Sequence, residues 1–129
     1  MTRYATPLAV TLTALFILVT ATVLPLQPVF GEGGARRDVV RAEEQNRQDA
    51  IMLATEAADH GQQGHVGALL TSAEAALQSA LKAGEAPHVD AGIRELKQAI
   101  EHGKAGHADV ATKHAGQAVI HLSEKYRTR

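Results

Sequence analysis

The chain has 129 residues, enough for one domain, and it contains no cysteine, which excludes disulfides, thiolate metal sites and thiol catalysis. Thirteen Lys and Arg against fourteen Asp and Glu give a formal net charge of −1, so the charge gives no support to nucleic-acid binding. With only two methionines, a thioether-rich copper(I) site is not expected either.

The first segment is typical of an export signal. Arg3 supplies a positive start, residues 7–24 carry no charge, and proline and glycine follow before Glu32. This pattern predicts a secretory signal peptide over residues 1–31. The alternative is an uncleaved membrane anchor, for which the apolar stretch is slightly shorter than the roughly 20 residues that span a bilayer. Both predict that residues 32–129 lie outside the cytoplasm, either free in the periplasm or anchored at the inner membrane.

The first helical hairpin is predicted between residues 36 and 82. Residues 36–60 are rich in Ala, Glu, Gln and Arg, which favour helix, and Gly61 is predicted to be the C′ glycine that ends it. A tight connection closed by Gly64 leads to a second helix over 65–82. The apolar residues of this second helix recur at helical spacing: Leu69, Leu70, Ala73, Ala76, Leu77 and Ala80.

A second hairpin is predicted after the helix-breaking stretch "AGEAP" at 83–87. Pro87 suits the first turn of a third helix, which runs to Gly103, and a fourth helix follows over about 108–122. Apolar residues again recur at helical spacing: Val89, Ile93, Leu96 and Ile100 in the third helix, and Ala108, Ala111, Ala115, Ala118 and Leu122 in the fourth.

The two hairpins are copies of one unit. "AADHGQQGH" (57–65) matches "AIEHGKAGH" (99–107) at an offset of 42 residues. Two amphipathic hairpins with short loops predict an all-α, up-down-up-down four-helix bundle over residues 32–129. Its core must be made of Ala, Leu, Ile and Val, because removal of the first segment would leave Tyr126 as the only aromatic residue. We therefore expect modest intrinsic stability.

Six of the seven histidines occupy positions that face another histidine when the hairpins fold about their turns, and the seventh, His114, faces Glu95. Opposed pairs predicted from this register are His60 with His65, His102 with His107, Glu95 with His114, and His88 with His121. Both turns should lie at the same end of the bundle. Imidazole is a ligand for zinc, copper, nickel and iron, and a carboxylate such as Glu95 can also ligate.

Helix capping is the alternative explanation for His60 and His102, since a cationic side chain is favoured at the end of a helix. It explains His65 and His107 poorly, because a protonated imidazole is disfavoured where a helix begins. The seven-residue spacing of His107, His114 and His121, with a mirrored series on the preceding helix, favours ligation over ordinary surface exposure.

The sequence resembles the small metal-binding protein family. The resemblance rests on "HGKAGHADVATKHAGQAVIHL" (102–122), the repeated "HGxxGH" turn and the secretory segment, and it covers about residues 50–125. It implies a His-rich periplasmic four-helix bundle that binds copper(II) and other divalent metals. The implied ligands are His60, His65, His88, His102, His107, His114 and His121. The family pattern is richer in histidine, and this chain has other residues where His would fit: Leu53, Ser72, Ser79, Ala91 and Glu95.

The predicted function is an exported protein that buffers, stores or carries divalent metal ions. Copper(II) is preferred, because the affinity order of divalent ions peaks there, and nickel(II) and zinc(II) are also accepted. No catalysis is expected, since no serine has an evident base-and-orienter arrangement. The alternative is an exported helical module that binds a protein partner and keeps its histidines as vestiges.

Overall fold

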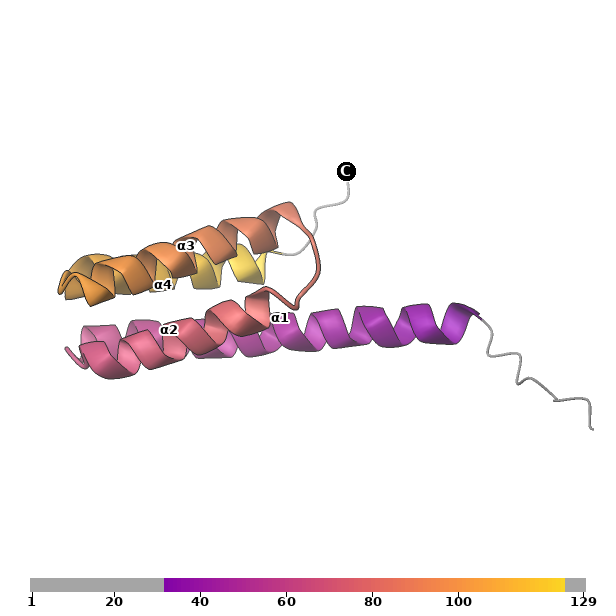
Figure 1. Cartoon of the computed structure of the whole chain (residues 1–129), viewed down its shortest axis with the longest axis horizontal. Helices are drawn as coiled ribbons and strands as arrows, with labels where there is room; N and C mark the ends of the chain where they lie inside the picture. The colour runs from indigo at the N-terminus through magenta and orange to yellow at the C-terminus, as the bar shows by residue number, and fades with distance from the viewer. Residues whose placement is uncertain (1–31, 125–129) are drawn as a thin grey trace, which may run out of the picture.

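The computed structural model describes residues 32–124, so the predicted signal or anchor segment at 1–31 lies outside the described residues. This part of the chain forms four α-helices and no strand (Figure 1): α1 (Glu32–Gln62), α2 (Val66–Ala80), α3 (Pro87–Lys104) and α4 (Ala108–Ser123). The predicted all-α fold is confirmed. Within the same residues, none of the helices is both long and apolar enough to span a membrane.

The helices pack at the four corners of a bundle. α1 packs against α2 and α4, and α3 packs against the same two helices, while α2 and α4 lie diagonally and contact each other far less. The α1–α2 and α3–α4 turns lie at the same end of the bundle, as predicted, and the α2–α3 connection lies at the opposite end (Figure 1). The first part of α1 extends beyond the bundle (Figure 1).

Each hairpin turn contains a glycine with left-handed backbone, Gly64 (φ 75°) in the first and Gly106 (φ 81°) in the second. In the first turn the N–H of His65 donates to the carbonyl of His60 at 2.8 Å, and the N–H of Gly64 donates to the carbonyl of Gly61 at 3.0 Å. These two bonds define a Schellman cap with Gly64 at C′. The prediction that Gly61 ends the first helix is therefore wrong, because α1 passes through it.

Gly61 is instead a point of close approach between helices. A Cβ at this position would collide with the side chains of Thr112 in α4 and Leu69 in α2. Gly103, its counterpart in the repeat, lies inside α3, and a Cβ there would come 2.8 Å from the Leu70 side chain. Leu70 and Thr112 are themselves separated by the repeat offset of 42 residues. The two hairpins, which repeat in sequence, therefore also make equivalent contacts with each other.

The core is built mainly from alanine, with leucine and valine as its larger fully buried side chains, and it divides into two clusters of buried residues. The loop-end cluster lies toward the α2–α3 connection: Ala50, Ala54, Ala76, Ala80, Ala83, Ala86, Val89, Leu96, Ala118 and Leu122. The turn-end cluster lies toward the hairpin turns: Ala57, Leu69, Ala73, Ala99, Ala111 and Ala115. The turn-end cluster has a single buried side chain larger than alanine, Leu69, so the end with five of the seven histidines has the smaller core.

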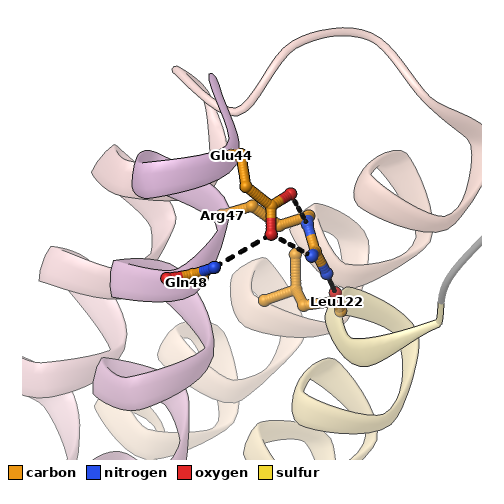
Figure 2. Close-up of polar contacts among 4 residues, drawn as sticks. All are labelled: Glu44, Arg47, Gln48 and Leu122. Carbon is orange, nitrogen blue, oxygen red and sulfur yellow. Dashed lines mark hydrogen bonds and ion pairs between the residues drawn. The ribbon is translucent and has the colours of Figure 1, made fainter. Parts of the chain in front are cut away.

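A charged side chain ties α1 to the end of α4 (Figure 2). Nη1 of Arg47 donates to the carbonyl of Leu122 at 2.7 Å, and its other nitrogens donate to both carboxylate oxygens of Glu44, at 3.0 and 2.6 Å. Gln48 also donates to Glu44, at 3.0 Å. The Leu122 carbonyl lies in the last turn of α4, where carbonyls have no partner within their own helix. Arg47 therefore acts as a cap supplied by another helix.

Replacing Arg47 with Ala is expected to lower the free energy of unfolding by about 1.5–3 kcal/mol, the usual worth of a hydrogen bond from a charged group. The Arg47 side chain is only 14% exposed, so solvent would restore little of the lost bond. Arg41→Ala is the matched control, because that side chain is 83% exposed and lies 3.9 Å from Asp38. Urea titration of both variants checks this, and equal losses would contradict the cap.

Candidate metal-binding site

The hairpin turns bring histidines together in pairs. In a Schellman cap the N–H of residue C″ bonds to the carbonyl of residue C3, and the two side chains lie in contact. In this chain C3 and C″ are His60 and His65 in the first turn, and His102 and His107 in the second. The ring centroids of His60 and His65 are 6.3 Å apart, and those of His102 and His107 are 5.8 Å apart. His65 and His107 precede α2 and α4 directly, yet neither side chain makes a capping hydrogen bond. Both predicted turn pairs are therefore confirmed as neighbours.

The second hairpin adds a third imidazole to its pair. The rings of His102 and His114 are parallel to within 2°, with centroids 5.3 Å apart. His102 is thus a ring neighbour of both His107 and His114. The register read from the sequence pairs residues straight across the hairpin, so it does not predict this contact between the diagonal neighbours His102 and His114.

A carboxylate holds the third imidazole. Nδ1 of His114 lies 2.7 Å from Oε2 of Glu95, which confirms the predicted pairing of α3 with α4 at these positions. Both side chains are a little over a quarter exposed, so the contact is partly shielded from water. The second hairpin therefore gathers three imidazoles and one carboxylate next to its turn.

The first hairpin lacks the same extension. Leu53 and Ser72 occupy the positions that correspond, at the repeat offset, to Glu95 and His114. In addition, Nδ1 of His60 is buried and has no hydrogen-bond partner among the described residues. The first turn is consequently a two-imidazole arrangement with no carboxylate to orient it.

A family model described as small metal-binding protein matches residues 11–125. The chain belongs to the small metal-binding protein family. The resemblance seen in the residues is thus confirmed, and the match covers both hairpins. No curated protein matches the chain.

The remaining two histidines lie at the loop end of this small metal-binding protein. His88 is in the first turn of α3 and lines a cavity that Arg47 and Glu124 also line. His121 is in the last turn of α4, with Nδ1 4.0 Å from Oε1 of Glu124. The pairing of His88 with His121 stays a prediction.

Metal binding by this member of the family requires a change of side-chain rotamer. Within residues 32–124, no three His, Asp or Glu side chains converge closely enough to hold an ion. The lone pair of an imidazole nitrogen lies in the plane of its ring, so the parallel rings of His102 and His114 direct their lone pairs along separate planes. Rotation of at least one ring would bring the nitrogens toward a common point. The donor chemistry of the three imidazoles fits a divalent metal.

Proposed function

We propose that this protein binds divalent metal ions through its histidine side chains in order to buffer, store or carry them. Copper(II) is the preferred ion and nickel(II) and zinc(II) are also bound, because nitrogen-donor sites follow an affinity order that peaks at copper(II). The action is binding and release, without catalysis.

The observation that carries the proposal is the cluster of His102, His107 and His114 at the second turn, where the ring centroid of His102 lies 5.8 Å from that of His107 and 5.3 Å from that of His114. The turn is already closed by its Schellman glycine, Gly106, so closing it does not require His102 in α3, His107 before α4 and His114 in α4. His60 and His65 offer a second, smaller pair at the same end of the bundle. His88 and His121 complete the proposed ligand set.

The proposed location is the periplasm, reached through the N-terminal segment. An uncharged stretch at 7–24 behind Arg3 supports export, and an inner-membrane anchor is the alternative if residues 1–31 stay attached. A metal carrier outside the cytoplasm suits an imidazole site, because the chain contains no cysteine that an oxidising compartment could convert to a disulfide.

The test is calorimetric titration of the full-length chain, in mild detergent because of its apolar segment, with copper(II), nickel(II) and zinc(II) at neutral pH. It is compared with a His102/His107/His114→Ala triple variant. Structural zinc sites in zinc-finger peptides are worth about 10–16 kcal/mol, or a few kcal/mol for each of their four ligands, so by analogy loss of three ligands should abolish the tight copper phase. Binding should also weaken on acidification, because protons compete for the ligand nitrogens.

The matched control is a His60/His65→Ala double variant, which removes imidazoles at the same end of the bundle but leaves the second turn intact. It should keep the tight phase. Negligible binding by the wild type, or tight binding that the triple variant retains, would contradict the proposal. The protein would then be better explained as a module that binds a protein partner, and capture of that partner in the presence of chelator would support this explanation.

A further inference from the structure

The Glu95–His114 contact restricts which nitrogen of His114 can carry a proton. An ionised carboxylate has only acceptor atoms, so the short 2.7 Å contact requires a proton on Nδ1 of His114, which donates it to Oε2 of Glu95. In a neutral imidazole the other nitrogen, Nε2, is then unprotonated and free to bind an ion. The contact thereby selects one tautomer of His114.

The same contact also holds the orientation of the ring. His114 is fixed on one edge by Glu95 and on one face by the parallel ring of His102. A ring that is held on two sides loses little rotamer freedom on binding, which makes it a prepared ligand. Rotation of His107 toward Nε2 of His114, or of His102 with the Glu95 hydrogen bond alone still holding His114, would then complete the site.

The first hairpin provides an internal comparison. His60 has a buried Nδ1 with no hydrogen-bond partner among residues 32–124. If Nε2 of His60 bound an ion, its Nδ1–H would be buried without an acceptor, which carries an unfavourable desolvation term. The positions equivalent to Glu95 and His114 hold Leu53 and Ser72, so no acceptor of this kind is built into the first turn.

We propose that Glu95 is a positioning residue for metal binding and not itself a ligand, in contrast to what its place in the predicted register suggested. It holds His114 as the Nδ1–H tautomer with Nε2 available to the ion, so the second hairpin binds metal before the first. The inference rests on the proposed function. Hydrogen-bonded carboxylates of this kind typically change metal affinity by about 10–100-fold when removed.

The first measurement is made without metal, so that it does not depend on binding. Long-range proton–nitrogen correlation spectra of the full-length, ¹⁵N-labelled chain report the tautomer of each imidazole. His114 is expected to be protonated at Nδ1 in the wild type and in Glu95→Gln, which retains an acceptor oxygen, and to shift toward the Nε2–H form in Glu95→Ala. If His114 keeps the Nδ1–H tautomer in Glu95→Ala, the inference is overturned.

The second measurement is titration with metal. Copper(II) affinity at the second hairpin should fall about 10–100-fold in Glu95→Ala, and Glu95→Gln should stay nearer to the wild type. Glu101→Ala is the matched control, because it removes an exposed carboxylate of the same helix. With zinc(II), the signals of His102, His107 and His114 should change before those of His60 and His65, and His114 should keep its Nδ1 proton.

A ligand role for Glu95 would give a different pattern. A neutral amide is a poor replacement for a carboxylate ligand, so Glu95→Gln would lose as much affinity as Glu95→Ala while keeping the tautomer, and this result would overturn the inference. Wild-type affinity in Glu95→Ala would overturn it as well, and it would leave the proposed function intact. Failure of the wild type to bind any of the metals would instead contradict the proposed function itself.

Discussion

Replacing Leu96 with Ala should lower the free energy of unfolding by about 2–5 kcal/mol, the range seen when a fully buried leucine is truncated. Leu96 is 0% exposed and lies in the loop-end cluster, where most of its buried neighbours are alanines. Alanine has no further side-chain atoms with which to fill the space, so the cavity should persist. Because domains of this kind are stable by only about 5–15 kcal/mol in total, the loss should be a large share of the whole.

Leu81→Ala is the matched control for Leu96→Ala. It removes the same atoms from a residue that is 61% exposed, and such changes usually stay within about 0.5 kcal/mol. Midpoints and slopes of guanidinium unfolding compare the two variants under identical conditions. Similar losses would show that the alanine core rearranges around Leu96, and that large buried side chains are not where the stability is concentrated.

Metal should raise the melting temperature of the protein strongly. An ion that binds only the folded chain stabilises it by about 4 kcal/mol at a thousandfold excess over Kd, which for a domain of this size corresponds to roughly 15–30 °C. Ions held by histidines of the unfolded chain reduce the shift, so these figures are upper values. Thermal unfolding followed by circular dichroism, with and without copper(II), measures the effect.

Two controls show whether the rise in melting temperature comes from metal bound at the second turn. A chelator should reverse the shift, and the His102/His107/His114→Ala variant should melt at nearly the same temperature with and without copper(II). An equal shift in that variant would place the stabilising ion elsewhere on the chain. Adding copper(II) to Leu96→Ala should recover part of its lost stability, because binding at the turn end and packing at the loop end contribute to the same unfolding equilibrium.

Much of the fold could be predicted because its signals are local. Apolar residues at helical spacing, the breaker before Pro87 and the repeated turns sufficed for four helices and their order. The end of α1 could not be predicted in the same way, since a glycine that ends a helix and a glycine at a close crossing look alike in sequence. The cap hydrogen bonds that place Gly64 at C′ and the packing of Gly61 against Thr112 distinguish them.

Contacts between site residues could be predicted from the sequence where the backbone geometry alone determines which side chains are neighbours. The turn pairs follow from the C3 and C″ positions of the cap, and the Glu95–His114 pair follows from the antiparallel register of α3 and α4. The stacking of His102 on His114 depends on side-chain rotamers, which register does not determine. For the same reason, the sequence could not show that the imidazoles lie close together without converging.

The unequal size of the two core clusters affects how an ion could leave the turn end. Three of the four largest fully buried side chains, Leu96, Leu122 and Val89, lie in the loop-end cluster, and Leu69 alone serves the turn end. Proteins open in cooperative units, and those with the fewest buried apolar contacts open most readily. The turn end should therefore exchange its amide hydrogens fastest in the metal-free chain and slow down once an ion bridges the two helices. Release would then need only local opening of the turns. The loop end would stay folded, so the turn end could close again on another ion.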